Sequence, residues 1–139
     1  MFQRILVPID LSDRNERALS VALAVARQNR ARVILLHVIQ TVPDVQAGEL
    51  RDFYERLEVA SVEKLARVAR RFMARRLRVD TEVFVGEPAR EIVRLAAGRR
   101  VDLIVMGSHT VRPGRPAAGW GTISYKVGIF CRCPVLLVK

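Results

Sequence analysis

Apolar and polar residues alternate along the chain in blocks whose spacing predicts strands separated by helices. Short runs of branched aliphatic residues are typical of buried strands, and they occur at residues 4–10, 32–39, 79–85, 101–106 and 135–138. Between them, apolar residues recur at steps of three and four, the period of a helix with one buried face. Such helices are expected from Ser12 to Asn29, at 49–77, at 89–97 and before the last strand.

Strands separated by whole helices cannot pair as hairpins, so they must run parallel and be joined by right-handed crossovers. The sequence therefore predicts an α/β fold, an open, doubly wound sheet of five parallel strands. The run 79–85 alternates apolar and polar residues more than the others, which indicates an edge strand. A chain of 139 residues fits one domain, residues 1–139.

The composition also predicts an aliphatic core and indicates where in the cell the protein is found. Half of the residues are apolar but only 6% are aromatic, as suits an α/β core. The chain opens without the pattern of a signal peptide, and its apolar runs are too short to cross a bilayer. We therefore expect a cytoplasmic protein without membrane insertion.

Cys131 and Cys133 are one residue apart and do not face each other on a strand or helix, so we expect ordinary free thiols.

The net charge of +10 raises the question of a nucleic-acid partner. The basic residues are spread over the expected helices, with a single dense cluster at Arg67, Arg70, Arg71, Arg75 and Arg76. No aromatic residues interleave with this cluster to stack on bases. A solvated helix face is therefore favoured over a specific nucleic-acid site, although weak nonspecific binding to polyanions is expected.

Two stretches could carry chemistry, and both follow strands. Asp10 ends the first strand, where a carboxylate could bind a ribose hydroxyl, a base edge or Mg²⁺, or could instead cap the first helix with Ser12. Gly107 directly follows the fourth strand and precedes Ser108 and His109. Gly121 and Thr122 open the last helix, whose free N–H groups could bind an anion. Taken alone, Gly107 and Gly121 are more typical of simple turn residues than of a phosphate site.

The remaining candidates give no positive case for an enzyme. His37 lies in the middle of a strand and is more typical of a core histidine with satisfied hydrogen bonds than of a catalyst. His109 has no partner carboxylate evident in the sequence. Neither a nucleophile triad, a carboxylate pair nor metal-ligand spacing stands out, so no catalytic residue and no metal ligand is predicted.

Taken in order, these elements resemble the universal stress protein family over essentially the whole chain. The matching segments are residues 4–12, 33–38, 86–88, 102–109 and 133–138. The resemblance implies the adenine-nucleotide α-hydrolase-like fold, with sheet order 3-2-1-4-5 and four flanking helices. It also implies a homodimer in which the last strand pairs with its two-fold mate through Val135, Leu136, Leu137 and Val138. Family members take part in stress survival; many bind ATP and others bind no nucleotide.

The same resemblance assigns a binding role to residues from both stretches. Asp10 and Val38 would contact adenine and its ribose edge, in a pocket lined by Pro8 and Ile9. The ribose and phosphates would be wrapped by Met106, Gly107, Ser108 and His109. The terminal phosphates would be held by Gly121, Thr122 and Ile123. The implied ligand is ATP, with or without Mg²⁺, or another adenine nucleotide.

The loop after Gly107 departs from the family pattern, which reads Gly, two residues, Gly, nine residues, Gly, then Ser or Thr. Thr110 stands at the second glycine, and ten residues separate it from Gly121. A threonine resists the positive φ that glycine allows and would crowd a phosphate. Two hypotheses follow: a nucleotide-binding regulatory module, or a nucleotide-independent dimer that acts through protein partners. Slow ATP hydrolysis or autophosphorylation is a weaker third.

Overall fold

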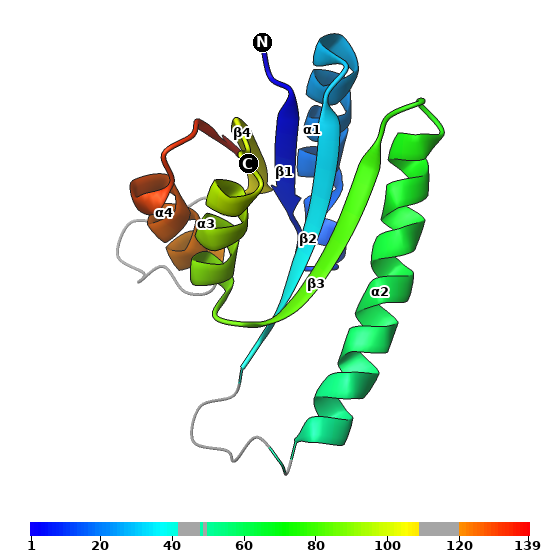
Figure 1. Ribbon diagram of the computed structural model, residues 1–139, viewed down its shortest axis with the longest axis vertical. Coiled ribbons are helices and arrows are strands. Elements are labelled where there is room, and N and C mark those ends of the chain that lie inside the picture. The colour runs from blue at the N-terminus through cyan, green and yellow to red at the C-terminus, as the bar shows by residue number, and fades with distance from the viewer. Residues whose placement is uncertain (42–47, 49, 109–119) are drawn as a thin grey trace.

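The computed structural model describes residues 1–41, 48, 50–108 and 120–139, with the backbone alone for residues 120–122. Within these ranges, five strands alternate with four helices and one 3₁₀ turn, and Figure 1 shows their arrangement. The strands are β1 (Arg4–Pro8), β2 (Arg32–Gln40), β3 (Val79–Gly86), β4 (Leu103–Gly107) and β5 (Val135–Val138). The helices are α1 (Glu16–Asn29), α2 (Arg51–Met73), α3 (Pro88–Gly98) and α4 (Trp120–Phe130), and the 3₁₀ turn (Asp13–Asn15) precedes α1.

The sheet has the predicted order and direction. Its strands run β3-β2-β1-β4-β5, and every neighbouring pair is parallel. This confirms the five-stranded, doubly wound α/β fold and places β3 at an edge, as its alternating sequence predicted.

Two hydrophobic cores lie on the two faces of the sheet, one beneath α1 and α2 and the other beneath α3 and α4 (Figure 1). Successive residues of the central strands point to opposite faces. The first core therefore takes Ile5, Val7, Val33, Leu35, Leu103 and Val105, and it adds Leu65 and Phe72 from α2. The second takes Leu6, Ile34, Leu36, Ile104 and Met106, with Ile92 from α3 and Val127 from α4.

Some strand boundaries differ from the prediction because the backbone at these positions turns or forms hydrogen bonds outside the sheet. β1 ends at Pro8 rather than at residue 10, because the chain then turns toward the 3₁₀ turn. β4 begins at Leu103 rather than at residue 101. The N–H of Val101 donates to the carbonyl of Ala96 at 2.9 Å and so helps to close α3.

Helix α2 differs most from the prediction. It ends at Met73 rather than at residue 77, and Arg76 then turns the chain toward β3 with a left-handed φ of 62°. Its first half extends beyond the end of the sheet (Figure 1), so Phe53 and Leu57 of the expected apolar stripe are 50% and 37% exposed. Although α2 has 23 residues, neither it nor another described helix is long and apolar enough to cross a membrane.

Candidate functional site

A small pocket lies where β1 and β2 reach their carboxyl ends and where α3 and α4 begin. Its volume is about 140 Å³, and its lining residues are Pro8, Ile9, Asp10, Leu36, Val38, Gln40, Pro88, Ile92 and Ile123. Ligands of doubly wound sheets bind at this edge, next to the strand at which the order reverses. Here the strand order reverses between β1 and β4, and the pocket lies beside this point, at the ends of β1 and β2.

The pocket brings together five of the residues predicted to bind a ligand, namely Pro8, Ile9, Asp10, Val38 and Ile123. It also contains four residues that the sequence did not single out as binding residues, namely Leu36, Gln40, Pro88 and Ile92. A signal existed for Pro88, because a proline after the Gly86-Glu87 turn indicates a helix start at the carboxyl end of a strand. Gln40 is the last residue of β2 and places an amide at the pocket.

Two hydrogen bonds hold Ile9 against β2. Its N–H donates to the carbonyl of Leu36 at 2.9 Å, and its own carbonyl lies 2.9 Å from Nδ1 of His37. Because a carbonyl can only accept, Nδ1 carries the hydrogen in this contact. His37 is thus a histidine with a satisfied hydrogen bond, half-buried rather than fully in the core. Its contact fixes the backbone that forms one wall of the pocket.

Asp10 holds the residues that start the first helical segment. Its Oδ1 accepts from the N–H of Ser12 at 2.9 Å, from the hydroxyl of Ser12 at 2.6 Å, and from Nδ2 of Asn15. Ser12 in turn accepts from the N–H of Arg14, as the N-cap of the 3₁₀ turn. The cap itself is therefore Ser12, and Asp10 supports it by accepting from Ser12 and from the side chain of Asn15. Because Asp10 also lines the pocket, the same carboxylate stands at the site where a ligand would bind.

The end of β4 is hydrogen-bonded to the end of β5 and to helix α4. The N–H of Ser108 donates to the carbonyl of Val138 at 2.8 Å, and the hydroxyl of Ser124 donates to the carbonyl of Gly107 at 3.3 Å. A Cβ built on Gly107 would meet no described atom within 4 Å, and its φ is not in the left-handed region. Among the described residues, then, neither crowding nor backbone strain explains this glycine.

The other predicted phosphate-side residues are not assembled by the described part of the structure. The side chain of Met106 is fully buried in the core beneath α3 and α4, so only its backbone could contribute at the surface. His109 and Thr110 lie outside the described residues, as does the side chain of Thr122. The backbone places Gly121 and Thr122 in the first turn of α4, where N–H groups lack helical partners.

Mg²⁺ would find few protein ligands here. In the described ranges, no three His, Cys, Asp or Glu side chains come together as a metal site. The pocket offers one carboxylate, Asp10. A single carboxylate fits Mg²⁺ only if the ion arrives with substrate phosphates and keeps its waters.

Cys131 and Cys133 are free and half-buried, as expected. Burial raises the pKa of Cys131 to about 11, with a smaller contribution from the neighbouring Cys133. Burial also raises the pKa of Cys133. Both are therefore protonated near neutral pH, which does not favour a reactive or metal-binding thiolate.

Several proteins similar to this chain are universal stress proteins. The model of the universal stress protein family matches residues 1–139. The chain is 38% identical to the universal stress protein in the QAH/OAS sulfhydrylase 3′ region of Thermus aquaticus, with full coverage of both proteins. The solved structure of MJ0577 from Methanocaldococcus jannaschii has a TM-score of 0.85 and 30% identity, and the match covers 100% of this chain and 96% of that one.

Two more distant structures of this fold contain adenine nucleotides. One, from Arabidopsis thaliana, has AMP bound; its TM-score is 0.71 at 19% identity, with 99% of this chain and 91% of that chain covered. The other is a universal stress protein in complex with cAMP, with a TM-score of 0.72 at 21% identity and coverages of 99% and 97%.

The hydrogen bonds of Asp10 predict a structural cost for removing its carboxylate, independent of any ligand. Asp10→Ala should lower the free energy of unfolding by about 1–3 kcal/mol, because Ser12 and the buried Asn15 lose their shared acceptor. Urea denaturation without nucleotide measures the change. The matched control Asp13→Ala, at an exposed position, should stay within about 0.5 kcal/mol of the parent. Equal stability of Asp10→Ala and the parent would contradict this structural role.

Proposed function

The chain belongs to the universal stress protein family, and from this premise we propose that it is a stress-response regulatory module that binds ATP or another adenine nucleotide. The observation that carries the proposal is the convergence on one pocket of Asp10, from the loop after β1, with Val38 of β2 and Ile123 of α4. This pocket lies at the carboxyl ends of the strands, beside the strand reversal at which α/β folds bind nucleotides.

The lining suits an adenosine group better than a sugar or a small charged metabolite. Ile9, Val38 and Ile92 provide apolar surface for the two faces of a planar base. Gln40 and Asp10 are the polar side chains, and these can recognise the edge of a base or the hydroxyls of a ribose. An apolar slot with a few polar groups at its border is the usual composition of a cofactor pocket.

The size of the pocket indicates which half of the ligand the described residues would hold. A volume of about 140 Å³ is smaller than the roughly 300–1,000 Å³ of pockets for drug-sized ligands. We infer that it takes the base and part of the ribose. The phosphates would then extend along Gly107 and Ser108 toward the first turn of α4, whose N–H groups and dipole favour an anion.

Thr110 replaces a glycine of the family's phosphate loop, and this replacement supports the alternative, a nucleotide-independent module. Ligands with one phosphate, such as the AMP and cAMP of the distant relatives, depend least on the altered loop. ATP depends on it most. With Mg²⁺, the ion would be held chiefly by phosphate oxygens, with Asp10 as the nearest described carboxylate.

We also propose that two copies associate through β5. The carbonyls of Pro134 and Val138 accept hydrogen bonds from β4. Because alternate residues of a parallel strand bond to the same neighbour, the backbone groups of Val135 and Leu137 face away from β4. Leu136 and Leu137 are also about 40% exposed on this edge. An unpaired apolar edge strand is a template for pairing with a second copy of itself.

Filling the pocket should abolish adenine-nucleotide binding. At a tenfold excess over its Kd, AMP should raise the melting temperature of the parent by about 5 °C. Val38→Trp should lose this shift in differential scanning fluorimetry, because the indole occupies the space of the base. Thr81→Trp, at an exposed position on β3, serves as the matched control and should keep it. If millimolar AMP and ATP both leave the parent unchanged, the nucleotide proposal fails.

Restoring the family glycine at residue 110 should favour ligands with longer phosphate chains. Thr110→Gly removes a β-branched side chain where the family pattern has glycine, so we expect about tenfold tighter ATP binding. Isothermal titration calorimetry with ATP measures the gain. Adenosine has no phosphates, and its affinity should not change. An equal gain for adenosine would show that residue 110 does not act through the phosphates.

A proline on the outer edge of β5 should separate the two copies. Leu137→Pro removes an N–H that faces away from β4 and leaves the pairing of β4 with β5 in place. Sedimentation velocity should find the parent dimeric at micromolar concentration and Leu137→Pro monomeric, with unchanged circular dichroism. Leu137→Val keeps the N–H and should remain dimeric. A parent that is monomeric at 100 μM would rule out this interface.

A further inference from the structure

A second concave surface lies at the amino ends of the strands, opposite to the carboxyl ends that form the nucleotide pocket. Helices α1 and α2 end there, and strands β1, β2 and β3 begin there. The surface encloses about 710 Å³. Seven of its ten lining residues are arginines: Arg27 and Arg30 at the end of α1, Arg75 and Arg76 after α2, and Arg4, Arg32 and Arg78 at the strand starts. We call this surface, defined by these seven residues, the arginine basin.

The charge of the arginine basin is not neutralised by its surroundings. None of the seven side chains forms an ion pair with any described residue. Two nearby carboxylates, those of Asp80 and Glu82, instead hold Arg99 at 2.8 and 3.1 Å. The carboxylate of Asp102 accepts the backbone N–H groups of Gln3 and Arg4. The acidic groups of this edge are thus already engaged.

Two features of the arginine basin work against the stability of the fold. Arg4 and Arg32 are register partners on neighbouring strands, and like charges opposite each other are unfavourable. Arg30 and Arg76 have φ values of 50° and 62°, in the left-handed region where glycine is the favoured residue. Helix C-termini attract cations, which accounts for the arginines at the ends of α1 and α2 but not for those at the strand starts, namely Arg4, Arg32 and Arg78.

The chain builds this surface from one short pattern used twice. Arg30-Ala31-Arg32-Val33 and Arg76-Leu77-Arg78-Val79 each place an arginine with positive φ, then an apolar residue, then an arginine that leads into a strand. The two strands, β2 and β3, are neighbours in the sheet. Parallel connection therefore brings both arginine pairs to the same edge, although they are far apart in the sequence.

We propose that the arginine basin binds a compact oligophosphate anion. Guanidinium groups donate two parallel hydrogen bonds to phosphate oxygens and remain charged at all physiological pH values, so converging arginines suit several linked phosphates. The other lining residues are Gln3, Ala31 and Leu77, and none can stack on a base. A hollow without an aromatic platform favours a small, highly charged anion over a nucleic-acid strand.

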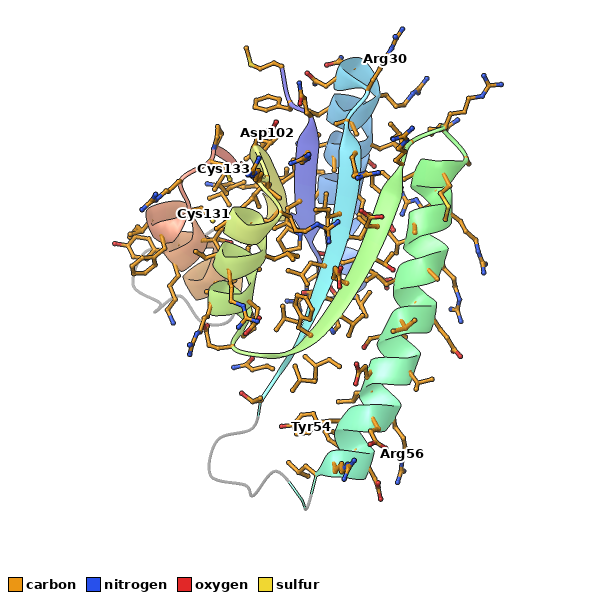
Figure 2. All side chains as sticks on the ribbon, viewed as in Figure 1. Arg30, Tyr54, Arg56, Asp102, Cys131 and Cys133 are labelled. Atoms are coloured by element: carbon orange, nitrogen blue, oxygen red, sulfur yellow. The ribbon has the colours of Figure 1, made fainter. Side chains whose placement is uncertain are left out.

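This site is separate from the nucleotide pocket, because the two lie at opposite edges of the sheet and share no lining residue. Figure 2 shows Arg30 at the end of α1 and, far from it, Arg56 at the other end of α2. Arg56 and Lys64 are exposed α2 residues outside the basin. They offer a control that removes the same amount of charge.

The test uses inorganic tripolyphosphate, titrated calorimetrically into the full chain at about 150 mM salt so that long-range attraction is screened. Arg30→Gly with Arg76→Gly should weaken binding at least tenfold. Its melting temperature without ligand should be equal to or above that of the parent, because glycine suits both backbone positions. Arg56→Gln with Lys64→Gln should change affinity less than twofold. Saturating AMP should leave tripolyphosphate binding unchanged.

Each other outcome would overturn the proposal. Equal weakening in both double variants would mean that net charge alone attracts the anion. Competition by AMP would place tripolyphosphate in the nucleotide pocket instead. Tighter binding of a 20-residue oligothymidylate, sensitive to Arg30 and Arg76, would assign the basin to single-stranded nucleic acid. Binding of a glutamate decapeptide as tight as that of tripolyphosphate would assign it to acidic protein segments.

Discussion

The constraint on which the structure depends is that the central strands of a parallel sheet must be buried on both faces. β1 and β4 consist almost entirely of aliphatic residues, and successive residues enter two different cores. Helices must therefore cover both faces, and every strand must point in the same direction. All strand carboxyl ends and helix starts then meet at one edge, and all helix ends and strand starts meet at the other.

The two edges differ in chemistry for this reason. Helix N-termini supply N–H groups and positive dipole ends near Asp10 and Gly107. Both properties favour a negatively charged group at this end of the sheet. Helix C-termini supply carbonyls and negative dipole ends, where cationic side chains are favourable. The chain places arginines there in larger number than dipoles require, including at the strand starts Arg4, Arg32 and Arg78.

Much of the fold could be predicted because its signal is local. Aliphatic runs and helical periodicity identified the strands and helices, and whole-helix connections required parallel pairing. Element ends were less accurate, since they depend on hydrogen bonds between distant residues: Val101 closes α3 instead of opening β4. The sheet order and the site residues came from family resemblance. Of the latter, Pro8, Ile9, Asp10, Val38 and Ile123 meet in the pocket. Pro88 and Ile92 were missed because their role depends on how α3 packs beside β2.

The surroundings of the charged side chains were the feature least well predicted from the sequence. Arg71 and Arg75 were both assigned to one solvated helix face. In the structure, Arg71 pairs with Glu16 of α1 at 3.0 Å, whereas Arg75 joins Arg27 and Arg30 in the arginine basin. A sequence pattern can locate a charge on its own helix. It cannot show which charges of other elements lie beside it, because the fold determines that.

The part of α2 that extends beyond the sheet should unfold locally more easily than the rest of the helix. Its second half contributes Ser61, Leu65, Ala69 and Phe72 as buried residues, whereas every described side chain from Arg51 to Ala60 is at least partly exposed. Segments with few buried contacts open at low free energy without unfolding the domain. In energetic terms α2 is therefore two segments: amides of the second half are protected by the core, and amides of the first half only by the turns of the helix itself.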